Sequence, residues 1–335
     1  MKRNVKKTYL ILLSLLTAAA TAVSLSGCGS QQSSVSSAAT TAATPSEASQ
    51  AESTTAQETT VSAADHLSES DITVSETLDN SEDGGHAITA DGESKDYSHV
   101  LVTKTGEADG DEADFYGENA AVFATNGGTL NLSDMVIKTN GTHANAVFSY
   151  GEGTTVNIAD SYINTTGNCS GGLMTTGGGT MNASNLTIET AGNSSAAIRS
   201  DRGGGTVNVT GGYYATAGKG SPVIYSTADI TVSDAEMVST ASQGVVVEGK
   251  NSVTLNNVQL TADNNTKNSD KSSYYQAVMI YQSMSGDAAQ GLSSFTMNGG
   301  SLVNKNGDVF FVNNTATEIS LDNASITNEG DGVFL

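Results

Sequence analysis

The chain is poor in cysteine, proline, tryptophan and basic residues. Among 335 residues it has two cysteines, two prolines and no tryptophan. Two cysteines cannot build the disulfide framework of a small secreted scaffold, so the fold has to be held by a core and by backbone hydrogen bonds. Only 14 Lys and Arg stand against 36 Asp and Glu, which gives a formal net charge of −22. This acidity argues against nucleic acid or an anionic membrane surface as partner and favours cations or neutral partners.

Long apolar runs are missing except near the N-terminus. Residues 1–7 are basic, residues 9–22 are apolar, and the sequence LSGC follows at 25–28. The apolar run is shorter than the roughly 20 residues of a membrane-spanning helix. The segment is similar to a lipoprotein signal peptide, which implies cleavage after Gly27 and attachment of diacylglycerol to Cys28. An ordinary signal peptide and a membrane anchor are the alternatives.

One octapeptide pattern recurs eight times from residue 130 onward. Its first, third and eighth positions are apolar, its second is polar, and its fifth is Asp, Asn or Gly. The copies are LNLSDMVI (130–137), VNIADSYI (156–163), MNASNLTI (181–188), VNVTGGYY (207–214), ITVSDAEM (230–237), VTLNNVQL (253–260), FTMNGGSL (295–302) and ISLDNASI (319–326). A second short apolar run precedes each copy. Most copies follow one another after 23–26 residues, and a period in this range indicates a solenoid.

Each repeat supplies three short strands separated by turns. Three strands per turn of about 25 residues predict an all-β fold, a right-handed parallel β-helix of about eight rungs with two loop insertions. The first and third octet positions are expected to point inward. The polar second position forms an outward ladder that either bonds from rung to rung or offers a polar face to sugar hydroxyls. The fifth position is expected to make a corner with a left-handed backbone.

This rung pattern resembles that of right-handed parallel β-helix proteins of the pectate-lyase-like superfamily, in the form of a bacterial surface lipoprotein of the adhesin or carbohydrate-binding type. The resemblance is specific for the fold rather than for an activity. It divides the chain into a lipoprotein signal peptide (1–27), a disordered Ser/Thr/Ala-rich tether (28–64), an acidic N-terminal cap or irregular first rungs (65–119) and the parallel β-helix (120–335). We expect the β-helix to be cut short at its C-terminus, because a ninth rung begins in the last three residues.

The repeats lack residues for the chemistry of this superfamily. A lyase needs acidic residues around calcium with a basic residue nearby, and a hydrolase needs converging carboxylates. From residue 120 onward the only arginines are Arg199 and Arg202, the only histidine is His143, and no two Asp are adjacent. We therefore predict that the protein is not an enzyme. We interpret Arg199 as part of an exposed strand end with a local ion pair.

The acidic stretch GEADGDEADFYGEN at 106–119 is the candidate metal site. Asp109, Asp111 and Asp114 offer the hard oxygen ligands that calcium prefers, although their spacing does not match an EF-hand. The alternative is a solvated acidic loop. No other cofactor is expected.

Two adjacent rungs carry insertions, at 261–276 and 282–294, on either side of the strand 277–281. In repeat proteins such insertions often mark the binding face. Aromatic rings beside amide and charged side chains suit sugar rings. The predicted ligand-binding residues are Tyr274, Tyr275, Tyr281, Gln282, Lys271 and Asp287.

A further column of mostly apolar residues is expected to face outward in the second strand of each rung. Its predicted members are Phe123, Phe148, Met174, Arg199, Ile224, Val247, Met279 and Phe311. Such a stripe is either covered by the acidic N-terminal segment, which we favour, or forms a protein-binding surface.

Together these features predict a monomeric rod that is anchored to the membrane through lipidated Cys28 on the extracellular face of the cell envelope. The predicted function is that of a non-catalytic adhesin or carbohydrate-binding protein, with a polysaccharide or a host cell-surface glycan as partner and no nucleic acid. One alternative is a polysaccharide lyase or hydrolase with its catalytic rungs beyond Leu335. Another is a surface scaffold that binds other proteins.

Overall fold

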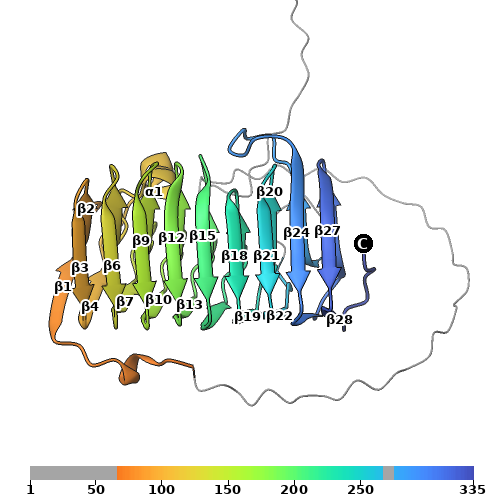
Figure 1. The fold of residues 1–335 in the computed structure, drawn as a ribbon, viewed down its shortest axis with the longest axis horizontal. Helices are drawn as coiled ribbons and strands as arrows, with labels where there is room; N and C mark the ends of the chain where they lie inside the picture. Colours follow the sequence, from red (N-terminus) through yellow and green to blue (C-terminus); the bar gives the residue numbers. More distant parts are fainter. Residues whose placement is uncertain (1–65, 267–274) are drawn as a thin grey trace, which may run out of the picture.

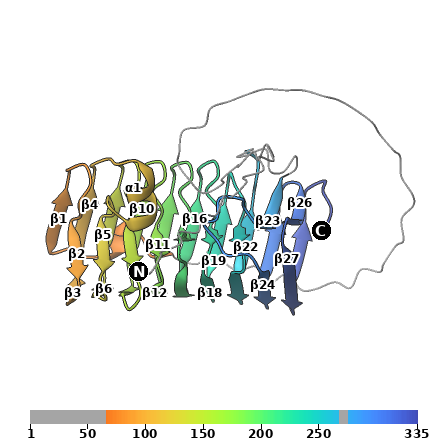
Figure 2. The same ribbon diagram turned by 90° about the horizontal axis from the view of Figure 1, so that it is seen from above.

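The protein folds as a parallel β-helix with three long parallel sheets, as predicted (Figures 1 and 2). The computed structural model describes residues 66–266 and 275–335. In this part of the chain the helices are a short 3-10 helix, η1 (Glu69–Asp71), and one α-helix, α1 (Gly110–Tyr116). Neither is long and apolar enough to span a membrane.

Each turn of the solenoid contributes one strand to each sheet. Sheet A contains β1 (Glu76–Asn80), β4 (Val100–Lys104), β7 (Val136–Thr139), β10 (Tyr162–Thr165), β13 (Thr187–Thr190), β16 (Tyr213–Thr216), β19 (Glu236–Ser239), β22 (Gln259–Ala262), β25 (Ser301–Asn304) and β28 (Ser325–Asn328). Sheet B contains β2 (Ile88–Asp91), β5 (Val122–Thr125), β8 (Val147–Tyr150), β11 (Leu173–Thr176), β14 (Ile198–Ser200), β17 (Ile224–Ser226), β20 (Val245–Glu248), β23 (Gln276–Tyr281) and β26 (Asp308–Asn313). Sheet C contains β3 (Ser94–Ser98), β6 (Thr129–Ser133), β9 (Thr155–Ala159), β12 (Gly179–Ser184), β15 (Gly205–Thr210), β18 (Asp229–Ser233), β21 (Ser252–Asn256), β24 (Leu292–Asn298) and β27 (Ala316–Asp322).

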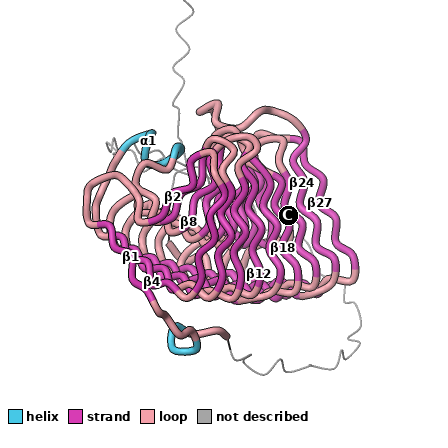
Figure 3. Tube along the Cα trace, turned by 60° about the vertical axis from the view of Figure 1, so that its left-hand side comes forward, coloured by secondary structure: helices cyan, strands magenta, loops and turns pink. Residues whose placement is uncertain are grey.

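The strands of successive turns stay in register along the whole solenoid (Figure 3). In sheet A, for example, Tyr162 pairs with Thr187, which pairs in turn with Tyr213. The first turn is made by β1, β2 and β3, which pair with β4, β5 and β6 in the same way as later strands do. Of the two alternatives for this segment, a cap or irregular first rungs, residues 76–98 therefore form a rung, which is regular, and the solenoid begins earlier than residue 120.

The core is built by the alternation that the octet predicts. In β9, Val156 and Ile158 are buried in the central cluster, whereas Asn157 between them faces outward. The same pattern holds in the neighbouring strands of sheet C, where the first and third octet positions are buried and the second is half-buried. Burial of these aliphatic side chains, each contributing about 1.5–3 kcal/mol, is the main force that closes each turn onto the next.

The corners between sheets C and A have the predicted left-handed backbone. Their φ angles range from 47° at Asp160 to 69° at Gly211. The eight corner residues with positive φ are Asp134, Asp160, Asn185, Gly211, Asp234, Asn257, Gly299 and Asn323. Asp, Asn and Gly tolerate this conformation best, which explains why these three types occupy the position in all eight octets; the rung before them has His99 at the equivalent corner, with a φ of 59°.

The outward Asn column bonds from rung to rung, which confirms one of the two interpretations of the ladder. The Nδ2 of Asn157 donates to Oδ1 of Asn131 at 2.8 Å, and the Nδ2 of Asn182 donates to Oδ1 of Asn157 at 2.9 Å. Asn208 continues the ladder by donating to Asn182 at 3.0 Å. These side chains therefore stabilise the stacking of sheet C.

A second column, which the sequence pattern did not reveal, consists of glycines in the turn that follows sheet A. Gly141, Gly167, Gly192 and Gly218 stack directly over one another. A Cβ atom on any of the last three would lie within 1.7–1.9 Å of the carbonyl oxygen of the glycine one turn earlier. Only glycine permits so close a backbone approach at these positions.

The first turns of the outward face of sheet B are covered by the N-terminal acidic segment, as predicted. Phe123, Phe148 and Met174 form a buried cluster, and a Cβ on Gly117, at the end of α1, would touch both phenylalanine rings. The predicted outward orientation is wrong for two members of the stripe. Ile224 and Val247 belong to the central core, and the outward places in β17 and β20 are taken by Tyr225 and Val246.

Candidate functional site

A groove lies on the outer face of sheet A, where β10, β13, β16 and β19 run side by side. It has a volume of about 620 Å³ and is lined by Tyr162, Thr187, Glu189 and Tyr213 together with residues 66–70. A second hollow of about 420 Å³ shares Thr187 and Tyr213 with it. This hollow continues over the next strands and is lined further by Asn185, Asp234, Glu236, Asn257 and Gln259. The two hollows form one groove along the solenoid axis, which we call the sheet A groove.

The register of sheet A positions two tyrosine rings in this groove. Tyr162 and Tyr213 are both half-buried and occupy the same outward column, with Thr187 between them. At the strand spacing of about 4.8 Å, two strands separate these residues by about 9.6 Å. The hydroxyl of Tyr162 donates to Oε2 of Glu189 at 2.6 Å, which holds its ring in place.

Both tyrosine hydroxyls remain neutral donors. Burial, reinforced by Glu189, raises the pKa of Tyr162 well above its ordinary value. Burial also raises the pKa of Tyr213, and the neighbouring carboxylates of Glu236 and Glu189 raise it further. The groove therefore combines aromatic rings, hydroxyl donors and carboxylate acceptors.

The first described residues of the chain lie in this groove. We call residues 66–71 the strap, and Figure 1 shows this segment in orange beneath the solenoid. The imidazole of His66 stacks on the ring of Tyr213, with ring centroids 4.1 Å apart and planes 21° apart. Its Nε2 lies 3.3 Å from Oε2 of Glu236, and Glu69 pairs with Lys138 at 2.6 Å.

This groove was not predicted from the sequence, although a signal for it is present there. The seventh position of the octet is the outward neighbour of the buried eighth position. From the second copy onward it reads Tyr162, Thr187, Tyr213, Glu236, Gln259, Ser301 and Ser325. Two aromatic residues and an acid in one outward column mark a different surface from the uniform Asn and Thr column of sheet C.

The predicted cleft between the insertions lies partly outside the described residues, and Tyr281, its described tyrosine on β23, is buried rather than open. Tyr274 and Lys271 lie outside the described residues. Tyr281 is only 1% exposed, and its hydroxyl donates to Oε2 of Glu248 at 2.7 Å. Tyr225 bonds the same carboxylate oxygen. Sequence reasoning placed Tyr281 at a loop edge, whereas its outward side on sheet B is covered.

Gln282 and Asp287 also have structural partners. Gln282 is buried, and its Nε2 donates to the carbonyl oxygens of Ser283 and Ala288, which closes the loop that follows β23. Asp287 accepts from Nε of Arg202 at 2.6 Å. Tyr275, just before β23, is half-buried. The structure therefore uses the described members of the predicted set largely to fold the insertion onto sheet B.

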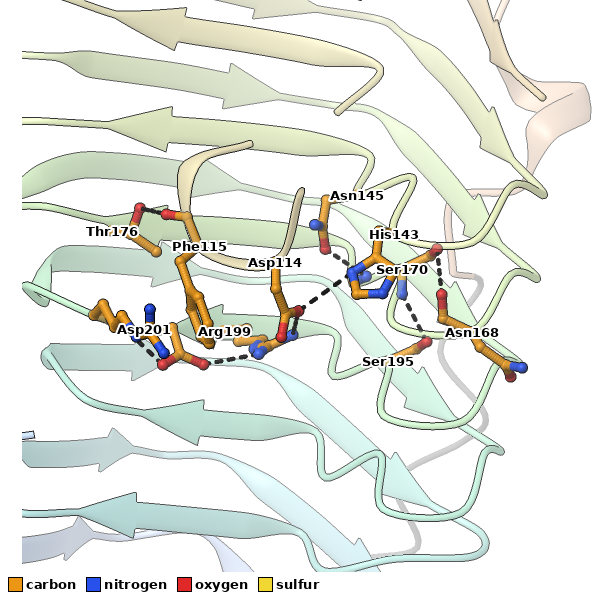
Figure 4. A network of polar contacts seen from close by, with 12 residues as sticks. Asp114, Phe115, His143, Asn145, Asn168, Ser170, Thr176, Ser195, Arg199 and Asp201 are labelled. Atoms are coloured by element: carbon orange, nitrogen blue, oxygen red, sulfur yellow. Dashed lines mark hydrogen bonds and ion pairs between the residues drawn. The ribbon is translucent and has the colours of Figure 1, made fainter. Parts of the chain in front are cut away.

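Beneath α1 lies a buried ionic network centred on Arg199 (Figure 4). Its Nη1 is 3.2 Å from Oδ1 of Asp114 on α1, and its Nη2 is 2.8 Å from Oδ2 of Asp201 at the end of β14. His143 approaches the same oxygen of Asp114 at 3.6 Å. All four side chains are buried. The local ion pair predicted for Arg199 is present, with Asp201, but the prediction of an exposed strand end is wrong, because the side chain is buried and also pairs with an aspartate from a helix 85 residues earlier.

The two aspartates that share Arg199 have pKa values shifted in opposite directions. Burial opposes ionisation of Asp114, but the charge of Arg199 and the contact with His143 outweigh it and hold its pKa below the usual range. Burial raises the pKa of Asp201 to about 7, and the nearby carboxylate of Asp114 contributes to this rise.

Asp201 should make the protein less stable as the pH rises from about 4 to 7. An aspartate in an unfolded chain has a pKa near 3.9, so over this window the folded state keeps a proton that the unfolded state has released. The stabilising contribution is complete below about pH 4 and is lost as the pH approaches 7. Relative to Asp201→Asn, the wild type should lose about 1 kcal/mol of unfolding free energy per pH unit in urea titrations. Parallel pH profiles for the two proteins would show that Asp201 does not titrate in this way.

The three predicted calcium ligands have different positions and partners, so they do not converge on one point. Asp114 pairs with Arg199, whereas Asp111 pairs with Arg202 at 2.7 Å. Asp109 is the residue that precedes the first turn of α1. Within residues 66–266 and 275–335, no group of three or more His, Cys, Asp or Glu side chains is arranged to hold a metal ion. The acidic stretch instead forms the helix that covers sheet B.

The predicted lipidation site, Cys28, lies outside the described residues. Comparisons of the chain with protein-family models, with curated proteins and with solved structures find no match.

Proposed function

We propose that the protein is a non-catalytic saccharide-binding protein of the cell envelope and that the sheet A groove is its binding site. The observation that carries this proposal is the pair of tyrosine rings, Tyr162 and Tyr213, two strands apart in one polar-lined groove. Tyrosine rings pack against the apolar faces of sugar rings, while carboxylates and amides bind the hydroxyls. The separation of about 9.6 Å suits two sugar rings of one chain.

The remainder of the chain supports a position on the cell surface. The lipoprotein-like leader and Cys28 would anchor the protein to the membrane, and residues 28–64 would hold the rod away from it. A rigid rod with binding positions repeated along its axis suits weak, multivalent contact with a polymer.

The carboxylates beneath α1 and on sheet B are out of reach of a sugar. A glycosidase or lyase needs carboxylates that a sugar can reach. Asp114, Asp201 and Glu248, the carboxylates grouped beneath α1 and on sheet B, are all buried and bonded to Arg or Tyr. These contacts give them a structural role.

The sheet C ladder is a weaker candidate for the saccharide site. A hollow of about 290 Å³ lies over Asn131, Asn157, Asn182 and Asn208. Each of these amides already bonds its neighbour, so a sugar would have to compete with an existing ladder. The groove on sheet A has aromatic rings, and the ladder has none.

A glycan array with residues 28–335 tests the proposal. We expect binding to at least one class of polysaccharide fragment, and we expect Tyr213→Ala to weaken it about 2- to 12-fold, because an aromatic contact contributes about 0.5–1.5 kcal/mol. Tyr275→Ala is the matched control, since Tyr275 is also half-buried but belongs to the loop region. Loss of binding in the Tyr275 variant with full binding in the Tyr213 variant would move the site to the insertions and refute the proposal.

A further inference from the structure

We infer that the ligand of the sheet A groove is a saccharide that carries protonated amines, of the kind found in glucosamine polymers. This inference rests on the proposed function and specifies its substrate class. It is carried by two independent features of the groove, which are the sign of its charge and the side chain already seated in it.

The charge of the groove is negative. Its acidic residues are Glu69, Glu189, Asp234 and Glu236. Among the described residues that line it, His66 of the strap is the only one that can carry a positive charge. Lys138, just outside the lining, is paired with Glu69. A uronic acid polymer would be repelled here, whereas an ammonium group would be attracted.

The contact made by His66 is a guide to the kind of chemical group that fits the groove. A flat ring stacks on Tyr213, and a nitrogen of that ring lies 3.3 Å from the carboxylate of Glu236. A glucosamine ring that packs on Tyr213 in the same way would bring its amine to the carboxylates of Glu236 and Glu189. An ammonium–carboxylate hydrogen bond is about twice as strong as a neutral one, which would favour the amine over a hydroxyl or an acetamide.

The strap therefore competes with the ligand for the ring of Tyr213. The other strap contacts, such as Glu69 with Lys138, are at the surface and are individually weak. Binding of a saccharide would displace the strap, and the free energy of the strap contacts would be subtracted from the free energy of binding. Removing the His66 ring should increase the affinity about threefold.

Calorimetric titration of residues 28–335 with three tetrasaccharides tests the inference. The probes are the tetramers of glucosamine, of N-acetylglucosamine and of glucose, at about pH 5.5, where carboxylates are ionised and amines are charged. We expect the glucosamine tetramer to bind about tenfold more tightly than the other two. Glu236→Gln should abolish this preference while neutral tetramers still bind, and His66→Ala should tighten binding of the glucosamine tetramer. Glu152→Gln, an equal change of charge at an exposed turn, is the control and should retain the preference.

The outcomes separate this inference from the proposed function. Equal affinities for the three tetramers, all reduced by Tyr213→Ala, would overturn the amine preference and leave the saccharide site intact. Binding of a lysine tetrapeptide without binding of the glucosamine tetramer would also overturn the inference, in favour of a basic peptide as ligand. Failure of all three tetramers together with a silent glycan array would refute the proposed function as well.

Discussion

Replacing Arg199 with alanine should lower the free energy of unfolding by about 3–5 kcal/mol, because the change leaves two buried aspartates without their common cation. Asp114 and Asp201 are each within 3.2 Å of the Arg199 guanidinium and have almost no contact with solvent. Arg199 also joins α1 to sheet B, so its loss would loosen the helix. Urea denaturation measures the loss of stability, and limited proteolysis within residues 106–119 measures the loosening of α1.

Arg202→Ala is the matched control for this experiment. The side chain of Arg202 is 34% exposed, although it stacks on Phe115 at 3.8 Å and pairs with Asp111 and Asp287. Because the guanidinium itself and Asp111 are open to water, although Asp287 is not, the loss should be smaller, about 1–2 kcal/mol. If both variants lose the same stability, the buried network does not hold α1 in place.

Gly192→Ala should destabilise the β-helix by about 3 kcal/mol or more, or prevent folding. A Cβ at this position would lie 1.7 Å from the carbonyl oxygen of Gly167, a backbone atom that cannot move without disturbing the turn below. Relieving the overlap would separate two rungs and lengthen their hydrogen bonds, which is the kind of overpacking that produces large losses of stability. Thermal unfolding followed by circular dichroism measures the effect.

Gly127→Ala separates this steric effect from the general cost of replacing a turn glycine. Gly127 has a φ of 77°, but a Cβ there would meet nothing within 4 Å. Its replacement should cost only the strain of a left-handed backbone, about 1–2 kcal/mol. Equal losses in the Gly192 and Gly127 variants would show that the glycine stack is not closely packed.

The fold could be predicted from the sequence because the same physical demand recurs in every turn. Val156 and Ile158 must be buried, and Asp160 must turn the corner, so each copy of the octet repeats their pattern. The glycine stack has the same period, but Gly167 and its equivalents lie outside the octet. They are required because a Cβ atom would overlap the backbone of the neighbouring turn. Nothing in their immediate sequence distinguishes them from ordinary turn glycines.

Contacts between the repeat and the segments outside it could not be predicted. Arg199 looked exposed because it occupies an outward place, and only the position of α1 reveals Asp114 as its partner. Tyr281 looked accessible for the same reason. The groove on sheet A was not predicted because Tyr162 and Tyr213 lie inside regular octets rather than in an insertion. Alternation along a strand tells which side a residue faces, but not what covers that side.

A crystal structure of residues 28–335 with a bound oligosaccharide, chosen as the strongest binder on the glycan array, tests the central claim most directly. The sheet A groove is predicted to hold the sugar, with one ring packed on Tyr162, another on Tyr213, and His66 displaced from the Tyr213 ring. Sugar bound at the Asn ladder of sheet C or beside the insertions, with His66 still stacked on Tyr213, would contradict the assignment of the groove as the binding site.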